Sequence, residues 1–311
     1  MSATAFRAQP FGASAAPAGI VRQIVAQTGV LPQVDLDYEP EILTLWITLR
    51  PEPKPVFTLP LIESVGRVQD AIIALWGRQE DRPIRYLAYR ASGSIFSLGG
   101  DLDYYLDCLR ANDRAGLRDY ADQATKVIRL NRSGLEGSVI TLTKVGGKAI
   151  GGGIDPARAC NVMVAEEDAT FSYPEINFNH FPISAVPVLS RHTGPIEAER
   201  ILLSGAEYSA REFLAKGAVD EVVACGTGDD WIRQYARRTM NTHSARVALI
   251  AAFNEQAGDM FGPLSACARS WTDHILNLRP VEIAKLQRIA AAQERMMGRM
   301  LRAAVAVAAH A

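Results

Sequence analysis

The chain has 311 residues, of which 48% are apolar and 22% are charged, the balance of a globular protein with a buried core. Its 33 basic and 34 acidic residues give a net charge of -1, whereas dedicated nucleic-acid binders are usually strongly basic. No uncharged stretch reaches the roughly 18 apolar residues of a membrane-spanning helix. These properties exclude disordered and collagen-like chains and argue against nucleic-acid and membrane partners.

The cysteines and the N-terminal segment favour a reduced, cytoplasmic compartment. The four cysteines are far apart and form no CxxC pair, so they predict neither a metal site nor a disulfide framework. Residues 1–19 contain seven alanines and two prolines but no continuous apolar run, so a secretory signal is not predicted. We expect residues 1–40 to be an N-terminal extension that is partly flexible.

The predicted elements alternate between strands and helices from about residue 42. Residues 42–49 alternate in hydropathy and predict a strand, and residues 61–76 repeat apolar side chains at helical spacing. Residues 86–90 predict a short strand, residues 117–128 an amphipathic helix, and residues 138–145 a strand that leads into glycines. This alternation favours an α/β fold with crossover connections.

The second half of the chain turns from mixed structure to helix. Ser209 and Glu212 have the spacing of a capping box, Gly217 is placed to end that helix, and residues 219–223 follow as a strand. From about residue 242 the chain is rich in alanine and predicted to be mostly helical, with an apolar stripe suited to core or subunit packing. We therefore divide the chain into a core at 41–240 and a helical C-terminal region at 241–311.

Several common motifs of enzymes are missing from the sequence. It contains no GxxxxGK[ST], no GxGxxG, no GxSxG and no HxxxH, which argues against nucleotide, serine-hydrolase and metal sites of those kinds. For His180, beside Phe178 and Phe181, a packed or surface position is expected rather than a catalytic role.

Two glycine-rich turns carry the chemistry that the sequence does predict. Residues 95–102 and residues 147–158 each follow a predicted strand, and glycines allow a backbone to approach a ligand closely. The second turn leads into a predicted helix, whose N-terminal N–H groups suit a developing anion. Two such turns facing each other would form an oxyanion hole from main-chain donors.

Two carboxylates near these turns are candidates for proton transfer. Asp155 and Glu175 are 20 residues apart and suit an acid–base pair on either side of a substrate. Each also has a structural interpretation. Asp155 precedes Pro156, a common pattern for a helix cap, and Glu175 follows Pro174, where a glutamate often only compensates the helix dipole.

The order of these pieces is more specific than any one of them. Over about residues 42–223 the chain resembles the crotonase (enoyl-CoA hydratase/isomerase) superfamily. The resemblance lies in the order strand, FSLGGDL, amphipathic helix, strand, GxAxGGGxD, short strand, YPEI and YSAREFLAKGAVDEVV. Within it the chain looks most similar to the diffusible signal factor synthases, through residues 96–102, 119–121 and 174–182.

The resemblance implies a ββα spiral core, a C-terminal trimerisation region, and roles for particular residues. Gly100 and Gly152 would donate the oxyanion N–H groups, and Glu175 and Asp155 would move protons. The positions expected to line the substrate are Leu98, Gly99, Gly151 and Ile183.

The resemblance also implies the reaction and the partners. No cofactor or metal is expected, because the substrate is itself a thioester of CoA or acyl carrier protein. The implied reaction is dehydration of a 3-hydroxyacyl thioester to a 2-enoyl product, with thioester hydrolysis as a further activity of signal synthases. A homotrimer or hexamer is expected.

This sequence departs from the family pattern at three points. Asp155 replaces a glutamate and is one methylene shorter, Pro156 follows it, and bulkier residues at 183–185 stand where signal synthases have glycines. A displacement of about 1 Å at a reacting centre can cost on the order of a hundredfold in rate. A second hypothesis is therefore a crotonase-fold protein that binds acyl thioesters or a partner protein without turnover.

Overall fold

The computed structural model describes residues 17–79, 81–258 and 261–308, and it is built around two β-sheets. In the larger sheet the strand order is β1-β2-β3-β5-β7-β10, with parallel neighbours except where β1 runs antiparallel to β2. Its strands are β1 (Val34–Glu39), β2 (Thr44–Leu49), β3 (Tyr86–Ala91), β5 (Ile140–Val145), β7 (Val162–Glu166) and β10 (Glu221–Val223). The smaller sheet consists of β4 (Ile95–Ser97), β6 (Lys148–Ile150), β8 (Thr170–Ser172) and β9 (Glu207–Ser209).

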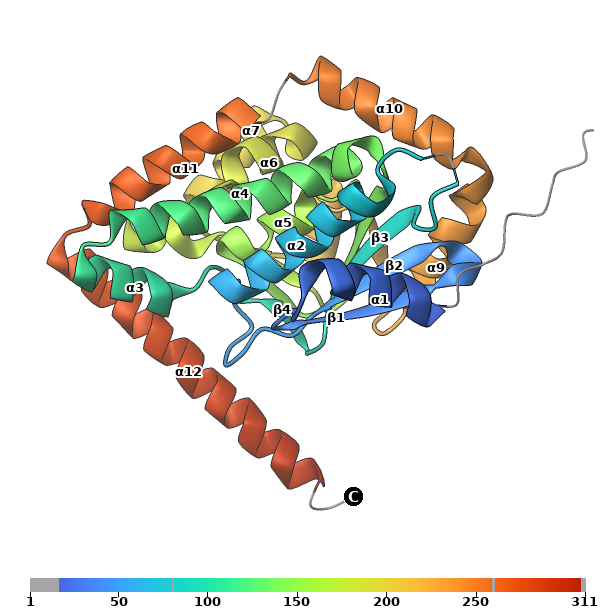
Figure 1. Cartoon of the computed structure of the whole chain (residues 1–311). Helices are drawn as coiled ribbons and strands as arrows, with labels where there is room; N and C mark the ends of the chain where they lie inside the picture. The colour runs from blue at the N-terminus through green and yellow to red at the C-terminus, as the bar shows by residue number, and fades with distance from the viewer. Residues whose placement is uncertain (1–16, 80, 259–260, 309–311) are drawn as a thin grey trace, which may run out of the picture.

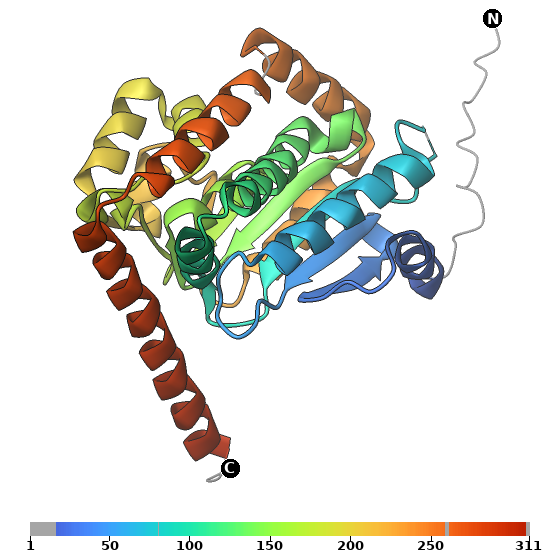
Figure 2. The ribbon, with the colours of Figure 1, turned by 60° about the vertical axis from the view of Figure 1, so that its left-hand side comes forward.

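Helices cover both faces of the larger sheet (Figures 1 and 2). The α-helices are α1 (Pro17–Thr28), α2 (Leu59–Trp76), α3 (Leu102–Ala111), α4 (Arg114–Gly137), α5 (Asp155–Arg158), α6 (Ala185–Thr193), α7 (Pro195–Ser204), α8 (Ala210–Ala215), α9 (Gly228–Thr239), α10 (His243–Gln256), α11 (Phe261–Leu276) and α12 (Pro280–Ala308). Short 3-10 turns are η1 (Pro40–Ile42), η2 (Gly151–Gly153), η3 (Pro174–Phe178) and η4 (Met240–Thr242). Successive strands pass from the larger sheet to the smaller one and back through helices, so the α/β class and the ββα spiral are confirmed.

In strand β2, the alternation of apolar and polar residues predicted one buried face, but both faces of the strand are buried. Leu45 and Ile47 pack with α2 and α4 in the main core, as the apolar face predicted. The opposite face is also covered, because Trp46 packs in a second cluster with Ile232 and Ala236 of α9. A largely parallel sheet is usually buried on both faces, and this one follows that rule.

The predicted N-terminal extension needs correction. Residues 1–16 lie outside the described residues, but α1 and β1 belong to the core. Every residue of β1 pairs with β2, and Ile20 and Ile24 of α1 are buried in the main cluster. Glu39 at the end of β1 also forms an ion pair with Arg233 of α9, with 2.9 Å between the carboxylate oxygen and the guanidinium nitrogen. The core therefore begins well before residue 41.

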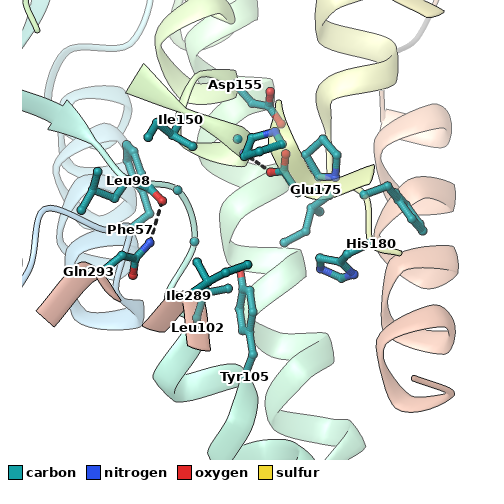
Figure 3. Close-up of a pocket in the computed structure, with 18 of the residues that line it drawn as sticks. Phe57, Leu98, Leu102, Tyr105, Ile150, Asp155, Glu175, His180, Ile289 and Gln293 are labelled. Atoms are coloured by element: carbon teal, nitrogen blue, oxygen red, sulfur yellow. Dashed lines mark hydrogen bonds between the residues drawn. The ribbon is translucent and has the colours of Figure 1, made fainter. Parts of the chain in front are cut away.

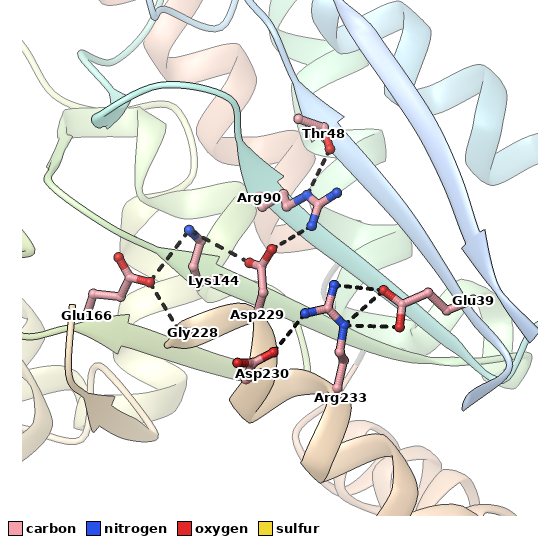
Figure 4. Close-up of polar contacts among 9 residues, drawn as sticks. All are labelled: Glu39, Thr48, Arg90, Lys144, Glu166, Gly228, Asp229, Asp230 and Arg233. Carbon is pink, nitrogen blue, oxygen red and sulfur yellow. Dashed lines mark hydrogen bonds and ion pairs between the residues drawn. The ribbon is translucent and has the colours of Figure 1, made fainter. Parts of the chain in front are cut away.

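A polar network fastens α9 to the sheet (Figure 4). The buried Glu166 of β7 accepts the N–H of Gly228, the first residue of α9, at 3.1 Å. The same carboxylate lies 3.6 Å from Lys144 of β5, and Lys144 lies 3.8 Å from Asp229. Asp229 in turn pairs with Arg90 of β3 at 2.5 Å. A carboxylate at the helix N-terminus is stabilised by the helix dipole, so this network anchors α9.

We predict that Glu166→Ala lowers the free energy of unfolding by about 1–3 kcal/mol, because it leaves the buried N–H of Gly228 without its acceptor and removes one of the two carboxylates beside Lys144. The measurement is urea unfolding of the full chain. The matched control is Glu167→Ala, since Glu167 is a half-exposed residue that pairs with Arg211 on the surface. A surface pair contributes about 0–1 kcal/mol, so equal losses in the two variants would contradict the anchoring role.

The predicted helical character of the C-terminal region is confirmed by α10, α11 and α12. The capping box of Ser209 and Glu212 is also present, at the start of α8. The N-terminal part of α12 packs beside α3, and its C-terminal part extends away from the rest of the molecule (Figures 1 and 2). Within the described residues, no helix is both long and apolar enough to cross a membrane.

Candidate active site

The parallel pairing of β4 with β6 brings the two glycine-rich turns together. Ser97 pairs with Ala149, so the chain leaves both strands at the same edge of the smaller sheet. The turns then touch, because a Cβ placed on Gly99 would lie 3.3 Å from the carbonyl oxygen of Ile150. The predicted juxtaposition of the two turns is therefore present.

A cavity of about 680 Å³ opens beside these turns (Figure 3). Its walls come from both glycine turns, η3, α4, α11 and α12, and most of its surface is apolar. All eight residues predicted for the site line this cavity: Leu98, Gly99, Gly100, Gly151, Gly152, Asp155, Glu175 and Ile183. The structure thus brings the predicted residues to one place, while their roles stay predictions.

Glu175 lies in η3 with its carboxyl group against the second glycine turn. Oε1 accepts the N–H of Gly152 at 2.9 Å, and Oε2 is buried without a partner among the described residues. Burial, with Asp155 nearby, raises the pKa of Glu175 to about 8. Glu175 is therefore mainly a neutral carboxylic acid at pH 7, with one oxygen available for proton exchange.

Gly151 makes this position of Glu175 possible. Its φ of +58° lies in the left-handed region, and a Cβ there would lie 2.1 Å from Oε1 of Glu175. Any side chain at this position would both strain the backbone and displace the carboxyl group.

Asp155 is fully buried and held by two hydroxyl groups. Tyr173 donates to Oδ1 at 2.8 Å and Ser184 donates to Oδ2 at 2.7 Å. Burial raises the pKa of Asp155 to about 7, although both hydrogen bonds oppose that rise. Among the described residues its side chain caps no helix N–H, so the interpretation of Asp155 as a helix cap is wrong. Ser184, from the segment that departs from the family pattern, is one of the groups that hold it.

The convergence of the two predicted oxyanion donors, Gly100 and Gly152, stays a prediction. Gly100 and Gly152 both line the cavity, but the N–H of Gly152 is used by Glu175 in this structure. A thioester oxygen would have to take the place of Oε1 at this N–H. At Gly100 a Cβ would lie only 2.0 Å from the Tyr105 hydroxyl oxygen, so that hydroxyl sits directly against the first turn.

His180, for which a packed or surface position was expected, is buried and also lines the cavity, which the sequence did not indicate. Trp271 of α11 donates its Nε1–H to Nε2 of His180 at 3.0 Å. Since indole nitrogen is only a donor, the neutral imidazole must carry its proton on Nδ1. Nδ1 is buried without a partner among the described residues, and burial lowers the pKa of His180 to about 3.

Helix α12 closes one side of the cavity. Gln293 donates to the carbonyl oxygen of Leu98 at 3.2 Å, and Ile289 and Met296 also line the cavity (Figure 3). Nothing local in the sequence marks these contacts, because the two bonded residues are 195 positions apart.

With this geometry in place, comparison with known proteins identifies the family. Residues 47–263 match the model of the enoyl-CoA hydratase/isomerase family, and the chain belongs to it. The resemblance to the crotonase superfamily is thereby confirmed.

Among curated proteins, the chain is similar to mevalonyl-coenzyme A hydratase sidH of Aspergillus fumigatus, with 28% identity over 59% of this chain and 63% of that protein. It is also similar to a probable enoyl-CoA hydratase of Bacillus subtilis, with 27% identity over 56% of this chain and 63% of that one. The match thus spans less than two thirds of the length of either relative. The crystal structure of an enoyl-CoA hydratase from Bacillus halodurans shares the fold, with a TM-score of 0.69, 20% identity, and coverage of 82% of this chain and 99% of that one.

We predict different effects of alanine at two adjacent glycines. Gly151→Ala should lower the free energy of unfolding by at least about 1–2 kcal/mol, because the left-handed backbone is strained and the new Cβ meets Glu175. Gly152→Ala is the matched control, since its Cβ would first meet Pro182 at an ordinary 3.7 Å. Chemical denaturation measures both, and equal stabilities would show that Gly151 does not hold Glu175 in place.

Proposed function

We propose that the protein dehydrates 3-hydroxyacyl thioesters to 2-enoyl thioesters, with Glu175 as the group that moves the proton. The observation that carries this proposal is the buried Glu175 carboxyl, with one unpartnered oxygen, beside two glycine turns in a largely apolar cavity. Membership of the enoyl-CoA hydratase/isomerase family supports the thioester as substrate.

The proposed reaction begins when the thioester oxygen replaces Glu175 at the N–H of Gly152 and also accepts from Gly100. These donors stabilise the enolate that forms as the C2 proton leaves. Glu175, as a carboxylate, takes that proton and delivers it to the departing 3-hydroxyl. The C2–C3 double bond forms as the C3–O bond breaks, and the product leaves with one molecule of water. Hydration of the enoyl thioester is the same sequence in reverse.

Asp155 is proposed as a positioning residue rather than the group that touches substrate. Both of its oxygens already accept hydroxyl hydrogens, which favours its charged form. A negative charge on Asp155 raises the pKa of Glu175. Of the two carboxyls, Glu175 is therefore the one that keeps its proton to the higher pH.

The carrier, the assembly and the cell compartment complete the proposal. Lys148, Arg288 and Arg299 line the same cavity and suit the phosphates of CoA or of the phosphopantetheine arm of acyl carrier protein. The proposal also includes a homotrimer or hexamer assembled through the C-terminal helices. It places the protein in the cytoplasm and gives it a signal-synthase-like activity that includes thioester hydrolysis.

We expect Glu175→Gln to lower kcat by about 10²–10⁴-fold while thioester binding survives, because an amide cannot exchange the proton. The assay uses 3-hydroxyacyl-CoA thioesters of several chain lengths with mass spectrometry of the products, and the control is Glu167→Gln on the surface. Binding without turnover of any chain length by the native protein would instead favour the non-catalytic hypothesis.

The pH dependence tests the link between the two carboxyls. Because the carboxylate form of Glu175 starts the reaction, kcat/KM should rise with pH, with its midpoint near pH 8, and level off roughly one pH unit higher. Asp155→Asn removes a negative neighbour, so the pKa of Glu175 should fall and the rise in kcat/KM should move to lower pH. An unchanged midpoint in this variant, with only a lower maximum, would show that Asp155 acts through structure alone.

A further inference from the structure

A second cavity, of about 550 Å³, lies between the C-terminal ends of α4 and α6 and the helix α10. We call it the arginine cavity, and its lining residues are Arg132, Asn161, Arg191, His192, Ile250, Phe253, Gln256 and Ala257. Among the described residues, none lines both this cavity and the candidate active site.

Arg132 is the unusual residue of the arginine cavity. Its guanidinium group makes no hydrogen bond or ion pair with any described residue, and its Nε is buried. Burial, with Arg191 and Arg158 nearby, lowers the pKa of Arg132 to about 9. A buried charge normally has a partner of opposite charge, because desolvation without one is costly.

Two more guanidinium groups at the arginine cavity have unused donors. Arg191 donates to the carbonyl oxygen of Phe253 at 3.0 Å, but its Nε is buried and unpartnered among the described residues. Arg158, behind the cavity wall, donates to Asp220 at 2.8 Å, and its Nε and Nη2 also lack described partners. Asp220 is the carboxylate near Arg158 and Arg132, and Arg191 adds a third guanidinium group to the region.

The surroundings add to this excess of positive charge. Burial and the three arginines lower the pKa of His192 strongly, so this imidazole stays neutral and keeps a donor for a ligand. The chain as a whole has a net charge of only -1, so the excess is local. On the opposite wall, Ile250 and the largely exposed Phe253 of α10 present apolar surface.

We propose that the arginine cavity binds a small organic oxyanion, a phosphate monoester or a carboxylate, with its charged group on Arg132 and Arg191 and its apolar part against α10. Guanidinium groups bind both kinds of oxyanion through paired N–H donors. The inference does not depend on the proposed function, since it concerns different residues and a different cavity.

The test is calorimetric titration of the full chain, in a buffer whose only anion is chloride, with inorganic phosphate, phenyl phosphate and phenylacetate. We expect saturable binding that weakens about tenfold or more in Arg132→Gln, because charge-assisted hydrogen bonds are lost. Arg132→Lys, which keeps the charge without the fork of donors, should be intermediate. Tighter binding of phenyl phosphate or of phenylacetate identifies which oxyanion the cavity prefers.

The matched control is Arg129→Gln, one turn earlier on α4, where Arg129 lies 3.8 Å from Glu136 near the surface. This variant should bind the probes like the native chain. Without ligand, Arg132→Gln should unfold at equal or higher urea concentration than the native chain, because it removes an uncompensated charge. That measurement also establishes that the variant folds.

Three outcomes would overturn the proposal. They are absence of saturable binding to the native chain, equal binding by Arg132→Gln, and a change of oligomeric mass in Arg132→Gln with no effect of the probes. The last would mean that an acidic side chain of a second copy is the natural partner of Arg132.

Discussion

The candidate site depends on the contact between the Glu175 carboxyl and the glycine turn at Gly151 and Gly152. The contact needs a position without Cβ, because a side chain at Gly151 would overlap Oε1. It also needs strand register: β6 pairs with β8 from Lys148 to Ile150, which carries η3 and the turn to the same edge of the smaller sheet. The Glu175 carboxyl is thus buried where its pKa rises and where a main-chain donor orients it.

The short helix α5 connects the two unusual electrostatic regions of the molecule. Asp155, its first residue, lies at the active-site cavity, where two carboxyls are buried together. Arg158, its last residue, pairs with Asp220 and lies near His192 of the arginine cavity, where Arg132 and Arg191 add two more guanidinium groups. Acidic groups are therefore gathered at one end of this helical turn and basic groups at the other, and Ala159 and Ile128 belong to a small apolar cluster.

Local motifs predicted most of the fold and the site, because strands, helices and glycine turns each leave a mark within about ten residues. The eight predicted site residues share one cavity for that reason. Strand β1 was missed because its sequence, VDLDYE, looks like a polar loop until β2 supplies its hydrogen bonds. The bond between Trp271 and His180 joins residues 91 positions apart, and no local pattern encodes such a contact.

The wrong interpretation of Asp155 has a specific physical cause. A capping residue needs an extended backbone just before the first helical turn. Here η2 leads directly into α5: Ile154 already has helical dihedral angles, and its N–H donates to Gly151. Asp155 therefore lies inside a continuous helical path, and its side chain is directed instead to Tyr173 and Ser184. Both Asp155 oxygens are thereby engaged with hydroxyl groups, whereas Oε2 of Glu175 is buried without a partner among the described residues.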